Sequence, residues 1–218
     1  MVRYFITGGG TGGHIYPAIA VADALLEDVN ASSQTNENSG KLKVKSGKLD
    51  MSSEASPLPS GEGAGVSELA NVTPAGEREI SEIFYVGNPK NLEYDIVKQK
   101  GYKFLPVNIH GMPRKFSFSL LKWLIQLNIA VFKCCYYILK YKPDAIFGTG
   151  GYVSAPTLIA GKLLNVPFMM HDCDAQPGLV TRHLAPYASA VSVAFEPACK
   201  FLNNKNCLSL AANKPFER

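Results

Sequence analysis

Five glycines and a histidine stand close together near the N-terminus, in the stretch ITGGGTGGHIYPAIAVADAL at positions 6–25. Glycine permits positive φ angles and lets the backbone approach a ligand closely. Free amide groups at a helix N-terminus favour anionic groups such as a pyrophosphate, and His14 can exchange a proton near neutral pH. Tight strand–helix packing alone would explain one or two of these glycines, so the stretch indicates a ligand-binding loop.

Gly8, Gly10 and Gly13 have the spacing G-x-G-x-x-G, which also occurs in dinucleotide-binding domains. A nicotinamide-dependent enzyme would need an acidic residue at the end of the second strand. Asp28 lies in the first predicted helix or just after it, and the next predicted strand ends in VGN, without a carboxylate. The sequence therefore disfavours a dinucleotide site, and we expect no tightly bound cofactor.

Predicted strands and helices alternate along most of the chain. Strands are expected at 2–7, 83–86, 103–107, 145–147, 167–171 and 190–195, and helices at 16–28, 92–100, 119–141, 154–164 and 179–187. Near-continuous apolar strands separated by helices indicate a parallel sheet that is covered on both faces. The sequence therefore predicts an α/β fold, a doubly wound Rossmann-like domain over residues 1–218.

Three glycine-containing loops follow strands of this predicted sheet, at residues 8–14, 148–152 (GTGGY) and 171–178 (HDCDAQPG). Ligands of doubly wound domains bind outside the carboxyl ends of the strands. We therefore expect the three loops to lie on one rim of the sheet.

Residues 30–79 differ in composition from the rest of the chain. They are rich in Ser, Gly, Glu, Asn and Pro and contain no aromatic residue. Such a segment buries too little apolar surface to offset the entropy lost on ordering. It is predicted to be a mostly disordered insertion in a surface connection, and a regulatory loop is the alternative.

The overall composition sets further limits. The 218 residues have a formal net charge of +4 and an ordinary apolar fraction, which excludes a chain that is disordered throughout. The cysteines at 134, 135, 173, 199 and 207 have neither metal-ligand nor redox-motif spacing. They predict buried free thiols in a reducing compartment, and no metal site. The N-terminus lacks the pattern of a signal peptide.

Three stretches together resemble the MurG-type N-acetylglucosaminyltransferases of peptidoglycan synthesis. They read GGGTGGHIYPAIAVADAL, VGNPKNLEYDIVKQKGYKFLPVNIHGMPRK and FGTGGYVSAPTLIAGKLLNVPFMMHDCDAQPGLVTRHLA, in this order. The resemblance implies the N-terminal, acceptor-binding half of an inverting GT-B glycosyltransferase. Such an enzyme transfers GlcNAc from UDP-GlcNAc to the muramic acid 4-hydroxyl of an undecaprenyl-pyrophosphate-linked muramyl-peptide, at the cytoplasmic face of the plasma membrane.

The resemblance also implies roles for individual residues. His14 would be the base that takes the proton of the attacking hydroxyl, and the helix N-terminus beside it would keep the imidazole neutral; the alternative is a histidine that only hydrogen-bonds substrate or backbone. Thr11, Gly12 and Gly13 would touch the donor. Gly150, Gly151 and Tyr152 would approach the acceptor pyrophosphate, or form a tight turn with Tyr152 as a core aromatic residue.

The third loop departs from the family pattern. The family usually has His-Glu-Gln-Asn where this chain has His171, Asp172, Cys173 and Asp174. Asp174 stands where the family asparagine lies beside the donor sugar, and an ionised carboxylate can only accept hydrogen bonds. Thr181 likewise replaces an asparagine. These changes bear on donor affinity and specificity more than on the fold.

The chain stops about where the interdomain linker of the family begins, so we expect no donor-binding half within it. Three explanations stay open: a fragment or truncated gene product, a separate chain that supplies the donor half, and a non-catalytic module that binds polyprenyl-pyrophosphate sugars at the membrane.

Residues 96–143 contain no Asp or Glu, and basic residues alternate there with apolar ones. This pattern suits an anionic membrane surface. The expected membrane contacts are Arg114, Lys115, Phe116, Phe118, Leu121, Lys122 and Trp123. Lys122 and Lys133 interrupt the apolar helix, which favours an interfacial position over a membrane span. A core helix with a solvated basic face is the alternative, and nucleic-acid binding is disfavoured.

Overall fold

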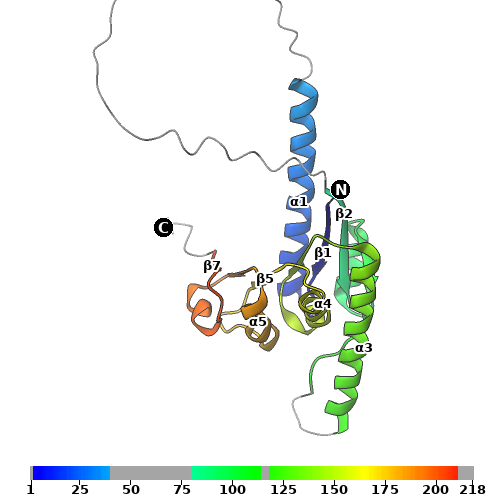
Figure 1. Ribbon diagram of the computed structural model, residues 1–218, viewed down its shortest axis with the longest axis vertical. Helices are drawn as coiled ribbons and strands as arrows, with labels where there is room; N and C mark the ends of the chain where they lie inside the picture. The colour runs from blue at the N-terminus through cyan, green and yellow to red at the C-terminus, as the bar shows by residue number, and fades with distance from the viewer. Residues whose placement is uncertain (1, 40–79, 114–117, 211–218) are drawn as a thin grey trace, which may run out of the picture.

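A seven-stranded parallel sheet forms the centre of the computed structural model, which describes residues 2–39, 80–113 and 118–210 (Figure 1). The strands are β1 (Val2–Thr7), β2 (Ile80–Gly87), β3 (Lys103–Pro106), β4 (Ala145–Gly148), β5 (Phe168–Asp172), β6 (Ala190–Val193) and β7 (Cys207–Ser209). Their order is β3-β2-β1-β4-β5-β6-β7, and each neighbouring pair is parallel.

Helices cover both faces of the sheet. They are α1 (Gly12–Ser39), α2 (Leu92–Gln99), α3 (Phe118–Tyr141), α4 (Gly151–Leu163) and α5 (Leu179–Leu184), with short 3-10 helices η1 (Ala185–Tyr187) and η2 (Glu196–Phe201). Successive strand residues point to opposite faces: Phe5 packs in the core shared with α3, α4 and α5, whereas Ile6 packs in the core under α1 and α2. The predicted doubly wound α/β fold is therefore confirmed.

Helix α3 packs on the domain by a narrow face. Its buried residues are Ala130, Cys134, Tyr137 and Ile138, and it lies against α4. Its first half extends beyond the body of the domain (Figure 1). Among the described residues, α3 is the one helix long and apolar enough to cross a membrane by length and composition, and 17% of its most apolar window is buried.

The glycine-rich stretch enters α1 earlier than predicted. The helix begins at Gly12, so His14 lies in its first turn rather than at the tip of a loop. The N–H groups of His14 and Ile15 both bond to the Thr11 carbonyl, at 3.1 and 3.2 Å. The helix also continues to Ser39, beyond its expected end, and so includes the start of the predicted insertion. Residues 40–79 of that segment lie outside the described residues.

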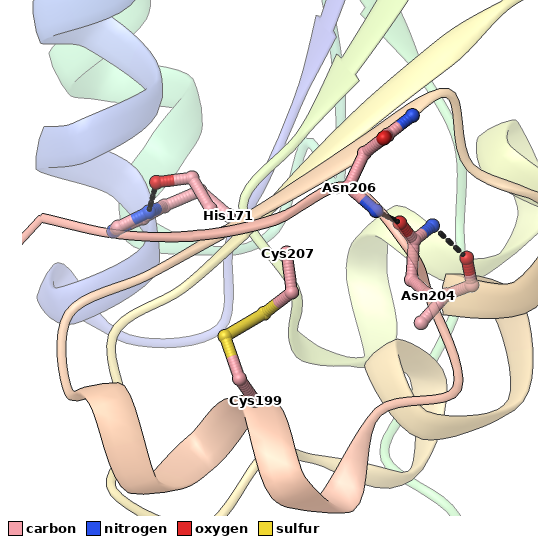
Figure 2. The surroundings of a disulfide bond; sticks show 7 residues. His171, Cys199, Asn204, Asn206 and Cys207 are labelled. Atoms are coloured by element: carbon pink, nitrogen blue, oxygen red, sulfur yellow. Dashed lines mark hydrogen bonds between the residues drawn. A yellow bond between two sulfur atoms is a disulfide. The ribbon is translucent and has the colours of Figure 1, made fainter.

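The C-terminal part of the sheet differs from the prediction. The sequence predicted free thiols, but Cys199 and Cys207 form a disulfide between η2 and β7 (Figure 2). Strand β7 was not predicted; it is three residues long and forms the edge of the sheet beside β6. Of the free thiols, Cys134 is buried, and burial raises its pKa to about 12. Cys135 and Cys173 are half-buried.

Candidate functional site

The three predicted loops meet at the carboxyl ends of neighbouring strands. The first follows β1, the second follows β4 and the third follows β5, and these strands are adjacent in the sheet. The chain reverses its direction of winding between β1 and β4, which is where doubly wound domains bind ligands. The expectation that the loops share one rim is therefore confirmed.

The three loops converge on His14, which is half-buried. A Cβ atom built on Gly151 would lie 3.0 Å from Cδ2 of the His14 ring, and one on Gly150 would lie 3.6 Å from Cε1. From the third loop, Cys173 Sγ lies 3.7 Å from His14 Nδ1. The Thr149 hydroxyl donates a hydrogen bond to the His14 carbonyl. The ring is thus enclosed by the second and third loops.

The second loop requires its glycines. Gly150 and Gly151 have φ angles of +77° and +70°, in the left-handed region that L side chains rarely adopt. A Cβ atom on Gly151 would also lie 2.8 Å from the Gly9 carbonyl oxygen. The first and second loops therefore touch through their backbones, and their glycines permit this contact.

Glu93 of α2 is fully buried and holds the first loop through hydrogen bonds of its carboxylate. Its carboxylate accepts hydrogen bonds from the backbone N–H of Asn88 (3.1 Å) and of Gly10 (3.4 Å), and from the side-chain amide of Asn91 (3.2 Å). A Cβ atom on Gly9 would lie 2.6 Å from this carboxylate. The sequence alone does not reveal this role, because an acidic residue in the first turn of a helix is normally a surface residue.

Tyrosine hydroxyls fix two more points of the rim. Tyr85, in β2, donates a hydrogen bond of 2.7 Å to the Gly8 carbonyl, and burial raises the pKa of its phenol well above the usual value. Tyr152, in the first turn of α4, accepts a hydrogen bond of 3.2 Å from the Asn91 amide. A Cβ atom on Gly10 would lie 2.8 Å from the Tyr152 ring. Tyr152 is half-buried and packs over the first loop.

The remaining residues predicted to bind substrate lie at the surface of the rim. Thr11, Gly13 and Asp174 are exposed, and Gly12 is half-buried. A Cβ atom on Gly13 would lie 3.6 Å from Cys173 Sγ, so the first turn of α1 faces the third loop. This places Asp174 near the N-terminus of α1, and the structure brings all predicted substrate-binding residues to one rim.

The third loop is shaped by Asp172, which is buried at the end of β5 and not part of the loop as predicted. Its two carboxylate oxygens accept hydrogen bonds from the N–H groups of Asp174 (3.0 Å) and Gly178 (3.2 Å). His171, also in β5, is buried with Nδ1 3.2 Å from the Ser192 hydroxyl. Burial lowers the pKa of His171, and proximity to His14 adds to this while Asp172 opposes it. Thr181 is buried beside the loop, and its hydroxyl has no protein partner.

The predicted membrane contacts lie at the start of α3. Phe118, Leu121 and Lys122 are exposed, and the Lys122 ammonium lies 5.3 Å from the centre of the Phe118 ring. Trp123 is half-buried, and its indole N–H donates a hydrogen bond of 2.8 Å to the His110 carbonyl. Arg114, Lys115 and Phe116 lie outside the described residues.

The chain matches a known protein family over more than half of its length. The model described as the glycosyltransferase family 28 N-terminal domain matches residues 4–38 and 75–193. The matched parts contain most of β1, nearly all of α1 and all strands from β2 to β6. The region between them, residues 39–74, which this family model leaves unmatched, lies entirely within the predicted insertion.

Several curated proteins with similar sequences carry the name UDP-N-acetylglucosamine--N-acetylmuramyl-(pentapeptide) pyrophosphoryl-undecaprenol N-acetylglucosamine transferase. One from Thermoanaerobacter sp. (strain X514) is 28% identical over 100% of this chain and 46% of its own length. One from Caldanaerobacter subterraneus subsp. tengcongensis is 30% identical over 97% of this chain and 45% of its own length. The chain therefore spans about half the length of the curated relatives it matches.

Among solved structures, the crystal structure of Acinetobacter baumannii MurG is similar in fold. The match has a TM-score of 0.63 at 20% identity, and it covers 96% of this chain and 45% of that one. The seven-stranded parallel sheet thus corresponds to a little under half of that chain.

Proposed function

The chain belongs to the glycosyltransferase family 28 N-terminal domain family, as the N-terminal half of a MurG-type enzyme, and from this premise we propose that it is the acceptor-side domain of an N-acetylglucosaminyltransferase. The reaction is the transfer of GlcNAc from UDP-GlcNAc to a lipid-linked muramyl-pentapeptide, with inversion at the anomeric carbon. The donor-binding half is supplied from outside these 218 residues.

The convergence of three loops on His14 is the observation that carries this proposal. An acceptor hydroxyl that lies beside the imidazole attacks the anomeric carbon and transfers its proton to His14. The bond from that carbon to the UDP oxygen breaks, and UDP leaves with the electron pair. The first turn of α1 places His14 at the rim and keeps it half-buried, which limits water around the proton transfer.

Backbone amide groups of two helix N-termini support binding of the charged substrates. Thr11 and the first turn of α1, with Gly12 and Gly13, form the proposed donor side of the site. The first turn of α4, with Gly151 and Tyr152, follows the second loop and is the proposed site for the acceptor pyrophosphate. Both ends present N–H groups and a partial positive charge, which favour phosphate oxygens.

A fusion of this chain to the donor-binding half of the Caldanaerobacter relative tests the reaction. We expect the fusion to transfer labelled GlcNAc to a lipid-linked muramyl-pentapeptide, and the isolated chain to transfer none. His14→Ala in the fusion should lower kcat by about 100-fold or more, with smaller changes in KM. His183→Ala, at an exposed histidine of α5, is the matched control. Unchanged kcat in His14→Ala would show that His14 is not the base.

The third loop favours a second candidate function. Asp174 is exposed at the rim and presents a carboxylate where the family pattern has an amide. The Asp174 carboxylate would repel the diphosphate of a UDP-linked donor that came close to it. In this second proposal the chain binds the polyprenyl-pyrophosphate sugar at a membrane and takes no part in transfer. Acceptor binding by a fusion that shows no transfer, together with a gain of transfer in Asp174→Asn, would favour this non-catalytic module.

We propose in addition that α3 rests on the cytoplasmic face of the plasma membrane, where a polyprenyl tail would remain in lipid. Apolar side chains recur along its outer face at every third or fourth residue and are exposed. We call them the α3 stripe: Phe118, Leu121, Ile125, Ile129, Phe132, Tyr136 and Leu139. Lys122 lies beside this stripe, and so does Lys140, whose ammonium lies 5.8 Å from the Tyr136 ring. Apolar burial and attraction to anionic lipid would then act together.

Vesicle sedimentation tests this placement. We expect binding to phosphatidylglycerol vesicles to exceed binding to phosphatidylcholine vesicles and to weaken as salt rises. Replacing Ile129 and Phe132 by Ser should weaken binding at least about tenfold, because burying one such side chain contributes about 1.5–3 kcal/mol. The matched control replaces two exposed leucines elsewhere, Leu163 and Leu179, by Ser. Equal losses in the two double variants would show that α3 does not face the membrane.

A further inference from the structure

Three side chains of different chemistry meet at the rim, next to the residue proposed as the base. Cys173 Sγ lies 3.7 Å from His14 Nδ1 and 4.0 Å from Asp174 Oδ1. One ligand atom from each of the three residues lies within 4.8 Å of the other two. Within the described parts of the chain, no other group of three or more His, Cys, Asp or Glu side chains comes together in this way.

This spacing is close to that of a tetrahedral zinc site. Zinc binds Cys sulfur at about 2.3 Å, His nitrogen at about 2.0–2.1 Å and carboxylate oxygen at about 2.0–2.2 Å. Tetrahedral geometry at these bond lengths separates neighbouring ligand atoms by about 3.4–3.7 Å. The pair of His14 and Cys173 already has this separation, and the exposed Asp174 side chain needs to move by only about 1 Å.

The backbone around the cluster is held in place by groups that are not themselves ligands. The Asp172 carboxylate is buried and already accepts the N–H groups of Asp174 and Gly178, which fixes the loop that carries two of the ligands. Gly13 lies against Cys173, so that a Cβ atom there would be 3.6 Å from the sulfur. The third ligand, His14, comes from the first turn of α1 and is enclosed by Gly150 and Gly151.

We propose that His14, Cys173 and Asp174 form a three-ligand site for a divalent ion of the zinc class, with one coordination position open. On binding, the Cys173 thiol loses its proton to solvent, so that a thiolate and a carboxylate together balance the charge of the ion. These two negative ligands also offset the partial positive charge at the α1 N-terminus, which by itself disfavours a cation. Two of the three ligands, Cys173 and Asp174, stand where the family pattern has glutamine and asparagine.

The consequence for activity rests on the proposed function. A metal ion on the His14 imidazole occupies the lone pair that would accept the acceptor's proton. Zinc bound at this cluster is therefore an inhibitor of transfer, and the transfer rate would fall as the concentration of free zinc rises. Binding of the ion itself does not depend on the transfer reaction.

Titration of the purified full chain with Co²⁺ tests the site, because cobalt bound to a thiolate gives a charge-transfer band in the near ultraviolet. We expect one Co²⁺ per chain, displaced by Zn²⁺. Cys173→Gln should abolish the band, and Asp174→Asn and His14→Gln should each weaken affinity by about tenfold or more. Cys135→Ser and His183→Gln remove a half-buried thiol and an exposed imidazole outside the cluster, and should leave the titration unchanged. Circular dichroism of each variant reports folding.

The outcomes separate the two proposals. Absence of a thiolate band in the folded parent chain, or a band that persists in Cys173→Gln, overturns the metal site. In the fusion with a donor-binding half, we divide the transfer rate with Zn²⁺ by the zinc-free rate of the same protein. This ratio should be at least about tenfold higher in Cys173→Gln than in the parent fusion, because zinc no longer binds and inhibits. A fusion that binds Co²⁺ at the cluster, but transfers no GlcNAc even when it is free of metal, overturns the proposed function and leaves the metal site standing.

Discussion

The candidate site has two sides, and the chain builds them differently. On the side of β2, β1 and β4, buried side chains hold the backbone at several points: the Glu93 carboxylate accepts three hydrogen bonds, and the Tyr85 hydroxyl donates one to Gly8. On the side of β5, the third loop is held by the single carboxylate of Asp172, which accepts two backbone hydrogen bonds. Cys173 and Asp174 extend from that loop to the rim, half-buried and exposed respectively.

This difference separates positioning from recognition. The buried side sets where His14 stands, since the backbone contact of the first and second loops leaves no room for displacement. The open side presents side chains that can change without disturbing the core. The departures from the family pattern at Cys173 and Asp174 fall on this exposed part of the rim, whereas Asp172 is buried beneath it, and the fold remains that of the family. We therefore expect substitution there to alter what the rim binds.

Loss of a buried carboxylate should show the contrast most strongly. Glu93→Ala leaves three N–H groups without their acceptor and opens a cavity, so we expect the free energy of unfolding to fall by about 4 kcal/mol. Asp172→Ala removes an acceptor for two N–H groups beside an exposed loop, and should lower it by about 2 kcal/mol. Urea denaturation of both variants measures the difference. A loss in Asp172→Ala equal to or greater than that in Glu93→Ala would show that the two sides are held equally.

The same contrast explains what could be predicted from the sequence. The order of strands and helices was predictable because each strand is a short, nearly continuous apolar run, and helical spacing of apolar residues separates one run from the next. Strand β7 was missed because it is three residues long and only partly buried, so that it lacks such a run. The disulfide of Cys199 and Cys207 was missed for the same reason, since β7 is what brings the second cysteine back to η2.

The site was predictable where glycines mark a close backbone contact. It was less predictable where a buried side chain positions the loop from within the core. The glycines at 150 and 151 require positive φ angles, so their spacing alone pointed to a functional turn. Glu93 gave no such signal, because an acidic residue in the first turn of a helix is normally a surface residue. Only the tertiary structure shows that its carboxylate points inward to the first loop. The cluster of His14 and Cys173 joins residues 159 positions apart, which no local pattern reports.

Addition of a methyl group should distinguish the two sides in a second way. In Gly151→Ala the new Cβ meets the Gly9 carbonyl at 2.8 Å, and the φ of +70° is strained for any L side chain. We expect a loss of about 3 kcal/mol in unfolding free energy. In Gly178→Ala, on the open side, nothing lies within 4 Å of the new atom and φ is −65°. The change there should be within about 0.5 kcal/mol of zero. Thermal denaturation followed by circular dichroism compares them, and a stable Gly151→Ala protein would refute the close contact.

The smallest expected effect is a dependence on pH that originates on the open side. His171 is buried at the end of β5, and burial holds the pKa of its imidazole below the usual value of 6.5. Above pH 6.5 the imidazole is neutral in both the folded and the unfolded chain. As the pH falls below 6.5, His171 is protonated in the unfolded chain but stays neutral in the folded chain. The free energy of unfolding therefore decreases.

This decrease ends when His171 is protonated in the folded chain as well, at its lowered pKa. We therefore expect the parent protein to lose up to about 1 kcal/mol more than His171→Gln between pH 7 and pH 5. His183→Gln, at an exposed histidine, should follow the parent. Urea denaturation at a series of pH values measures the difference, in which the titration of all other groups cancels. A parent and a His171→Gln variant with parallel pH profiles would show that this imidazole is as free to charge as one in water, and that the β5 side is open to solvent down to the strand itself.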